Sequence, residues 1–211
     1  MRYKWLNKEG NNKLILFFNG WGMDEGVVKH LDSEDYDILM FYDYNTLETD
    51  FDFESLNIYP EKNLIAWSMG VMIGGIISTL IRPLSTFSHQ GRRVCINGTL
   101  KPIDEEFGIH PKIYDLTIKG FNEKGQKRFI GSMFNETIDI NCNRDIDEQH
   151  SELIALKNYQ ADETFKYNKI LISDNDKIIP TKSQVAFWGI EPNLKGGHCP
   201  FFNFTKWSEL L

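Results

Sequence analysis

The chain has 211 residues, of which 41% are hydrophobic and 13% aromatic, so it is long enough and apolar enough to bury a core. Its formal net charge of −7 argues against a general binder of nucleic acid or of anionic membranes. The start MRYKWLNKEGNNK lacks the apolar segment of a secretory signal, and the three cysteines, without metal-ligand spacing, fit a reducing compartment. We therefore expect a single-domain cytoplasmic protein, a monomer, with no metal, no cofactor, and no nucleic-acid or membrane partner.

Short apolar runs recur along the chain with little alternation between apolar and polar residues. They cover residues 13–18, 36–41, 63–67, 93–97 and 169–173. Such runs are typical of parallel strands that are covered on both faces, and helical or mixed segments separate them. The pattern predicts an α/β fold, with a mostly parallel central sheet and helices on both faces. Residues 101–165 interrupt this rhythm, and we interpret them as a helical insertion after the fourth strand.

The segment AWSMG follows the third predicted strand. A serine at a sharp turn from a strand into a helix is exposed at the edge of the sheet, and the close approach of the two backbones favours small residues on either side. Ala66 and Gly70 meet that requirement around Ser68, and Gly74 and Gly75 extend the small face along the following helix. Ser68 is therefore a candidate nucleophile, although the pattern also fits an ordinary strand, turn and buried helix.

A nucleophilic serine needs a base, an acid that orients the base, and an oxyanion hole. His198 lies in the glycine loop KGGHCPFF, downstream of the segment SDNDKIIP that follows the fifth predicted strand. That segment offers two acids, Asp174 and Asp176. The glycines of FFNGWG, after the first predicted strand, allow the backbone N–H of Trp21 to face the site, and the N–H of Met69 directly follows the nucleophile.

The order of these parts resembles the α/β-hydrolase superfamily, with Asn19 in place of the histidine of its H-G-W-G motif. The segments FFNGWG, FYDY, AWSMGV, INGT, FGI and GGH, with the aromatic run FFNFTKW, resemble one branch in particular, the pimeloyl-ACP methyl ester esterases of the BioG type. That resemblance implies a serine carboxylesterase of biotin biosynthesis, which releases methanol from pimeloyl-ACP methyl ester and has acyl carrier protein as its partner. It also favours Asp176 over Asp174, because the superfamily commonly has a proline four residues after its acid, here Pro180.

Two features depart from that branch. Residues 76–93 form a longer connection, and the strand expected before His198 is shortened to IEPNLK. Two other functions stay open: a hydrolase for another small carboxylester or thioester, and a non-catalytic α/β-hydrolase that serves as a binding module.

The insertion carries apolar side chains that can roof over Ser68 as a lid and accept an alkyl chain. From it we expect Phe107, Ile109, Phe129 and Met133 to line the acyl pocket, with Ile113, Tyr114, Phe121 and Phe134 as further apolar residues. The resemblance adds the ring of Trp21 as a wall of that pocket. The alternative is that these residues form only the insertion's own core.

Basic residues are in surplus in part of the insertion, with five lysines and arginines against two acids between positions 112 and 128. Acyl carrier proteins are acidic, so this surplus predicts a docking face that includes Lys124, Lys127 and Arg128. The alternative is a solvated helical face.

Overall fold

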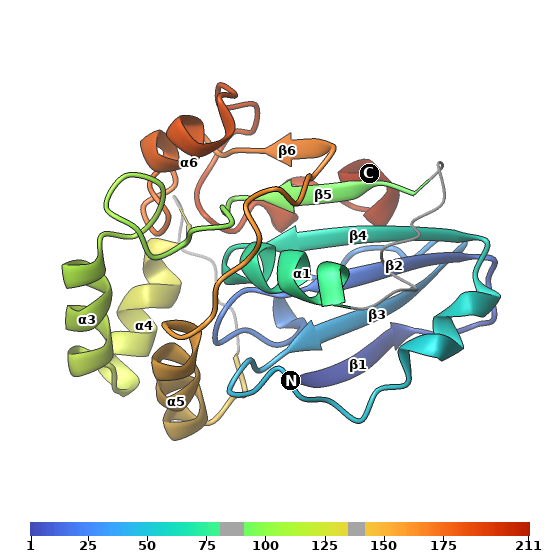
Figure 1. Ribbon diagram of the computed structural model, residues 1–211, viewed down its shortest axis with the longest axis horizontal. Helices are drawn as coiled ribbons and strands as arrows, with labels where there is room; N and C mark the ends of the chain where they lie inside the picture. The colour runs from blue at the N-terminus through green and yellow to red at the C-terminus, as the bar shows by residue number, and fades with distance from the viewer. Residues whose placement is uncertain (81–90, 135–141) are drawn as a thin grey trace.

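The computed structural model describes residues 1–80, 91–134 and 142–211. Within these residues a six-stranded sheet has the order β1-β3-β2-β4-β5-β6 (Figure 1). Its strands are β1 (Arg2–Asn7), β2 (Lys13–Phe18), β3 (Tyr36–Tyr42), β4 (Glu61–Trp67), β5 (Arg93–Ile96) and β6 (Lys169–Leu171). β1 is antiparallel to β3, and the other neighbouring strands are parallel. The mostly parallel α/β architecture expected from the sequence is confirmed.

Helices cover both faces of the sheet. The α-helices are α1 (Met69–Leu80), α3 (Pro111–Gly120), α4 (Glu123–Ser132), α5 (Ile146–Leu156) and α6 (Thr181–Trp188), and the 3₁₀ helices are η1 (Glu25–Val27), η2 (Phe53–Ile58), η3 (Phe201–Asn203) and η4 (Trp207–Leu210). Figure 1 shows α1 in front of the sheet, and α3, α4 and α5 together beyond the carboxyl ends of the parallel strands. In the part of the chain that is described, no helix has the length and apolar character needed to cross a membrane.

Two stretches named in the sequence analysis are only partly covered. Residues 81–90 of the connection 76–93, and residues 135–141 of the insertion, lie outside the described residues. The described part of the insertion contains α3, α4 and α5, which follow β5 and precede β6.

β2 shows why the apolar runs of the sequence lack alternation. Leu16 and Phe18 pack in one buried cluster with the residues of α1. Phe17 points to the other face, where its ring lies edge-on to the rings of Phe201 and Trp207, with centroids 5.6 and 5.2 Å away. A strand with both faces buried needs apolar residues at every position.

β1 is absent from the strands expected from the sequence. It lies at the edge of the sheet, and its residues Arg2–Lys4 are exposed. The strand therefore alternates charged residues with Tyr3 and Trp5 and forms no continuous apolar run. An edge strand with one face in water is expected to alternate in this way.

The turn from β4 into α1 holds Ser68 in the left-handed backbone region, with φ of 58°. Such a conformation is strained for a residue with a side chain and is typical of a nucleophile elbow. A Cβ on Gly70 would lie 2.2 Å from the carbonyl oxygen of Phe18, so only glycine fits there. Gly74 also faces the Phe18 ring, as expected for close packing on the sheet, whereas Gly75 faces the connection after β5.

The chain leading to His198 forms no full strand within the described residues. Leu194 makes a single parallel bridge with Ser173, and the N–H groups of Asn193 and Leu194 donate to the carbonyl of Ile172. The shortened strand expected there is thus reduced to one bridge, which still directs the histidine loop along the carboxyl edge of β6.

Candidate active site

The structure brings Ser68, His198 and Asp176 together in one buried line. His198 Nε2 lies 2.8 Å from Ser68 Oγ, and His198 Nδ1 lies 2.8 Å from Asp176 Oδ2. None of the three residues is more than 6% exposed. A neutral imidazole that donates from Nδ1 to a carboxylate can accept the serine proton at Nε2. The arrangement can therefore activate Ser68 Oγ for acyl transfer.

The Asp176 carboxylate is held by donors on both oxygens. Oδ1 accepts the backbone N–H groups of Ile178 at 2.8 Å and of Ile179 at 3.1 Å. Oδ2 accepts Gln184 Nε2 at 2.8 Å in addition to the His198 ring. Gln184 comes from α6 and is fully buried. These bonds leave the carboxylate one orientation, with Oδ2 directed at the histidine.

Asp174, the other acid considered, lies on the outer side of the same loop. Its Oδ2 accepts from Lys195 at 2.7 Å and its Oδ1 from the backbone N–H of Gly196 at 3.1 Å. The hydrogen bond from the Lys195 ammonium lowers the pKa of Asp174. Of the two acids, Asp176 contacts the His198 ring, and Asp174 ties the histidine loop to the turn after β6.

The histidine loop is held through its backbone. The carbonyl of His198 accepts the indole N–H of Trp67 at 2.8 Å and the side-chain amide of Asn97 at 2.9 Å. Gly98 packs on the serine turn, where a Cβ would lie 2.5 Å from the carbonyl oxygen of Ser68. The segment INGT resembles the BioG branch, but none of its residues was predicted to belong to the site. The structure shows that this segment joins the serine turn to the histidine loop.

The NGWG loop, from which the sequence predicts one oxyanion donor, lies beside the serine turn, since a Cβ on Gly20 would lie 3.2 Å from Ser68 Cβ. Asn19 is fully buried and closes the loop on itself, because its Nδ2 donates to the carbonyl of Asp24 and its Oδ1 accepts the N–H of Gly20, both at 2.9 Å. Within the described residues, the backbone N–H groups of Trp21 and Met69 donate to no protein acceptor. Both are therefore available to an oxyanion formed at Ser68.

A cavity of about 130 Å³ opens onto Ser68. Of the five residues expected to line the acyl pocket, Trp21, Ile109 and Phe129 are among its walls. The rings of Trp21 and Phe129 lie edge-on, with centroids 4.7 Å apart. Because its walls are mostly apolar, the cavity suits an alkyl chain better than a charged group.

Phe107 and Met133, the other two residues expected to line the acyl pocket, are not among the walls of this cavity. The Phe107 ring packs edge-on against Phe187 of α6, with centroids 5.5 Å apart. Met133 is buried in the cluster on the face of the sheet opposite to α1, and its carbonyl accepts the N–H of Cys199 at 3.1 Å. Both residues are apolar because they pack other elements together.

Ile113, named in the sequence only as a further apolar residue of the lid, is also a wall of the cavity. Thr117 of α3, and Lys177 and Ile178 of the loop that carries the acid, line it as well and were not chosen from the sequence. The spacing of Ile109, Ile113 and Thr117 by four residues places them on one side of α3 and its start, and this pattern could have identified them. No local pattern distinguishes Lys177 and Ile178.

A groove of about 310 Å³ continues from this cavity between α3 and α4. The two hollows share Ile113, Thr117, Phe129 and Ile178 as walls, and Arg128 lines only the outer one. A larger hollow of about 520 Å³, between the segments around Lys101 and Glu163, has none of the three aligned residues in its lining.

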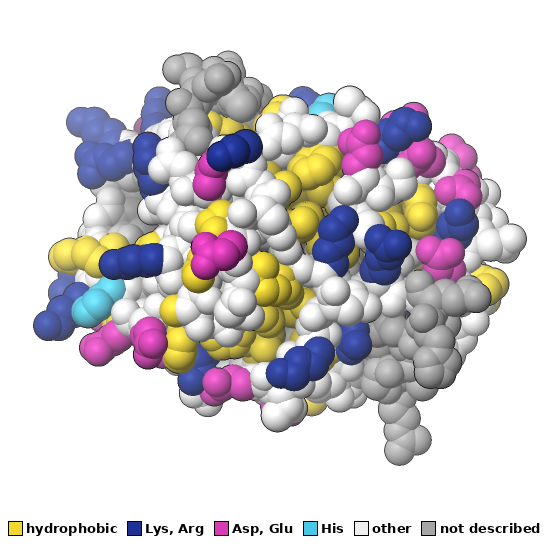
Figure 2. Space-filling view, turned by 90° about the horizontal axis from the view of Figure 1, so that it is seen from above, with side chains coloured by type: hydrophobic (Ala, Val, Ile, Leu, Met, Phe, Trp, Pro, Cys, Tyr) yellow, Lys and Arg dark blue, Asp and Glu magenta, His cyan; other side chains and the backbone are white. Residues whose placement is uncertain are grey.

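The basic residues expected to dock a carrier protein lie on α4. Lys124, Lys127 and Arg128 are exposed, and none of the residues of α4 is buried. Figure 2 shows Lys and Arg side chains gathered at the end of the molecule where α3 and α4 lie in Figure 1.

Cys199 directly follows the candidate base but does not offer a second nucleophile. It is 5% exposed, and burial raises the pKa of its thiol. A buried thiol that stays protonated is a poor nucleophile.

Comparison with known sequences gives close relatives of this chain. The family model described as "Pimeloyl-ACP methyl esterase BioG" matches residues 1–210. An uncharacterized protein of Haemophilus influenzae is 33% identical over 223 residues, which cover 100% of this chain and 99% of that protein. A malonyl-[acyl-carrier protein] O-methyltransferase of Bacteroides fragilis is 34% identical over 183 residues, which cover 82% of this chain but only 36% of that protein.

Solved structures share the fold. The crystal structure of BioG from Haemophilus influenzae superposes with a TM-score of 0.84 at 29% identity, covering 100% of this chain and 99% of that one. A thermophilic esterase from Thermogutta terrifontis superposes with a TM-score of 0.62 at 11% identity over 94% of this chain and 86% of that one, which shows the fold alone. Because the family model spans nearly the whole sequence, the chain belongs to the BioG family of pimeloyl-ACP methyl esterases.

Proposed function

We propose that this chain hydrolyses pimeloyl-ACP methyl ester to pimeloyl-ACP and methanol in the cytoplasm, as a step of biotin biosynthesis. The proposal rests on one observation above all. Ser68, His198 and Asp176 form a hydrogen-bonded line that opens onto an apolar cavity, in a chain of the BioG family. A single chain contains every residue that the mechanism needs, so we propose that it acts as a monomer.

The first half of the reaction transfers the acyl group to the enzyme. Ser68 Oγ attacks the carbonyl carbon of the methyl ester while His198 Nε2 takes the serine proton. The charge that develops on the carbonyl oxygen is stabilised by the N–H groups of Trp21 and Met69. Asp176 holds the imidazole and stabilises its protonated form. His198 then protonates the departing methoxide, so methanol leaves and the acyl group stays on Ser68.

The second half returns the enzyme to its starting state. His198, now neutral, takes a proton from a water molecule, which attacks the acyl carbonyl carbon. The tetrahedral intermediate collapses, the bond to Ser68 Oγ breaks, and His198 returns the proton to that oxygen. The product is a free carboxylate at the end of the chain that carried the methyl group.

The other end of the acyl chain has to remain attached to its carrier. We place the alkyl chain against Trp21, Ile113 and Phe129 in the cavity, with the carrier's arm in the groove between α3 and α4. These helices then act as a lid over the acyl chain. The carrier protein docks where that groove reaches the surface, at Lys124, Lys127 and Arg128, because its own surface is acidic.

The test is an assay of the purified protein on methyl pimeloyl-ACP beside shorter and longer diacid methyl esters on the same carrier. We expect release of methanol, with the pimeloyl ester among the best substrates, and no release by Ser68→Ala. Hydrolysis of simple carboxylesters or thioesters alone would favour a hydrolase with another substrate. Failure of the wild-type protein to react with a fluorophosphonate would favour a binding module.

A further inference from the structure

A buried ion pair lies beneath the NGWG loop and has no part in the mechanism described above. Glu152, on α5, is fully buried, and its Oε2 accepts Arg144 Nη1 at 2.5 Å. Arg144 is itself 9% exposed, and its Nη2 lies 3.1 Å from Asp43 Oδ1. An ionised pair at such depth loses its hydration, and that cost can exceed the attraction between the charges. Burial accordingly raises the pKa of Glu152, and the Arg144 guanidinium opposes that rise.

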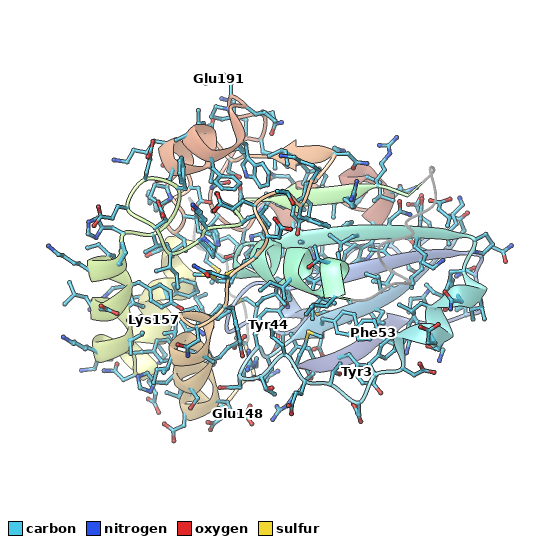
Figure 3. All side chains as sticks on the ribbon, in the orientation of Figure 1. Tyr3, Tyr44, Phe53, Glu148, Lys157 and Glu191 are labelled. Carbon is cyan, nitrogen blue, oxygen red and sulfur yellow. The ribbon has the colours of Figure 1, made fainter. Side chains whose placement is uncertain are left out.

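The Glu152 carboxylate binds one end of the NGWG loop directly and reaches the other end through Tyr44. Its Oε2 accepts the N–H of Gly22, the residue after Trp21, at 3.4 Å. Its Oε1 accepts the N–H of Tyr44 at 2.9 Å. The Tyr44 hydroxyl in turn lies within hydrogen-bond distance of two carbonyls, that of Asn19, two residues before Trp21, at 2.9 Å and that of Phe41 at 3.0 Å. In Figure 3 Tyr44 lies between the carboxyl end of β3 and α5.

Trp21 itself is tied to the same helix. Its indole N–H donates to the carbonyl of Gln149, less than one turn before Glu152, at 2.9 Å. The Gln149 side chain also packs on Gly22, where a Cβ would lie 2.9 Å from Gln149 Oε1 and would require that side chain to shift. α5 is therefore linked to the loop before, at and after Trp21, the residue whose N–H is the proposed oxyanion donor.

We propose that Glu152, held by Arg144, is a positioning residue of the oxyanion hole, which fixes the NGWG loop so that the Trp21 N–H stays directed at the oxyanion. The inference rests on the proposed ester hydrolysis. A buried ion pair is weak evidence for stability, because well-packed apolar residues in its place are often neutral or stabilising. The direct bond to Gly22 and the link through Tyr44 to Asn19 give this pair a function that apolar residues cannot supply.

The first variant is Glu152→Gln, which keeps the shape of the side chain but removes its charge and one acceptor. The substrate is a small soluble ester, so that docking of a carrier protein does not affect the measured rate. Loss of one oxyanion donor costs roughly a hundredfold to a thousandfold in kcat, and a misdirected donor costs less, so we expect kcat to fall about tenfold to a hundredfold. KM should change little, because the ground-state ester does not depend on this N–H.

A trifluoromethyl ketone supplies the readout that separates positioning from stability. Its adduct with Ser68 carries an oxyanion, so its inhibition constant should rise by about the factor by which kcat/KM falls. Tyr44→Phe is the second variant, because it removes only the Tyr44 hydroxyl. It tests the proposal by itself if Glu152→Gln does not fold. We expect this variant to lower kcat and to weaken binding of the inhibitor in parallel, both by a smaller factor than in Glu152→Gln.

Glu148→Gln is the matched control. Glu148 lies one turn earlier on α5 and pairs with Arg2 on the surface at 2.7 Å, so the variant loses an ion pair without touching the loop. It should keep wild-type kcat and inhibitor affinity. The proposal is overturned if Glu152→Gln and Tyr44→Phe lower the melting temperature but keep both quantities at wild-type values. If the wild-type protein hydrolyses no ester, the proposed function fails, and this inference fails with it.

Discussion

The site around Ser68 and the helices α3 and α4 above it are built in opposite ways. In the site, His198 is buried and bound from three separate segments, through Asp176, Trp67 and Asn97. In contrast, α3 buries only one of its residues, Tyr114, and α4 buries none. The proposed chemistry thus depends on side chains fixed in a dry interior, and the proposed docking depends on charges in water. Substitutions in the first region should cause large losses that salt does not change, and those in the second should cause small losses that salt does change.

Ser68→Ala should show the largest effect. Loss of a triad nucleophile leaves only binding and the oxyanion hole, so kcat should fall roughly a millionfold. The substitution removes one oxygen, so the melting temperature should stay near that of the wild type, which circular dichroism can check. A variant that keeps a tenth of the wild-type turnover would remove Ser68 from the mechanism.

Asp176→Asn should be the next most damaging, with a loss on the order of ten-thousandfold in kcat, because an amide can hold the imidazole in the wrong tautomer. Asp174→Asn is its control, since Asp174 binds only the outer part of the same loop, at Lys195 and Gly196. Steady-state kinetics on one ester compares the two variants. If Asp174→Asn is the worse of them, the assignment of the acid is wrong.

Gln184→Leu tests whether the hydrogen bond from Gln184 to the Asp176 carboxylate contributes to stability and activity. The variant removes the donor to Asp176 Oδ2, and a hydrogen bond to a charged group contributes about 1.5–3 kcal/mol. We expect the free energy of unfolding in urea to fall by about that amount, and kcat to fall less than in Asp176→Asn. Lys182→Leu, at an exposed position of the same helix, controls for changes in α6. Equal free energies of unfolding for the two variants would show that the hydrogen bond from Gln184 to Asp176 does not stabilise the fold.

The smallest effect is expected on α4. Replacing Lys124, Lys127 and Arg128 by glutamine should slow hydrolysis of the carrier-bound ester by between about threefold and about a hundredfold, because exposed ion pairs contribute roughly 0.2–1 kcal/mol each. Hydrolysis of a small soluble ester should not change. In the wild type, only the carrier-dependent rate should fall with salt, since the Debye length shrinks from about 10 Å at 0.1 M to about 3 Å at 1 M.

The matched control for that variant neutralises three exposed lysines elsewhere, Lys8, Lys29 and Lys166. It changes the net charge equally, so a similar loss would mean that overall charge, and not the face on α4, attracts the carrier. If the α4 variant loses both activities equally, its basic residues support the structure of the lid. If it loses neither, the carrier docks at another surface.

The sequence predicted the buried parts of the fold better than its edges. A buried strand such as β2 is recognised in the sequence by its unbroken run of apolar residues. The edge strand β1 alternates charged and aromatic residues and has no such run. Apolar character alone does not tell which side of an element a residue faces, so the packing of Phe107 on Phe187 and of Met133 in the cluster opposite α1 could not be predicted. Asn97 could not be assigned, because the carbonyl it binds lies 101 residues later in the chain.

Anchoring of the His198 carbonyl also determines when, during synthesis, the site becomes complete. The bonds from Trp67 and Asn97 join residues that are 131 and 101 positions apart. Contacts between such distant residues form only after long loops have closed. On the ribosome, Ser68 therefore emerges well before the loop that carries its base has left the exit tunnel. A nascent chain then exposes a serine without a base, and it can hydrolyse no ester until the segment around His198 has been translated and has docked.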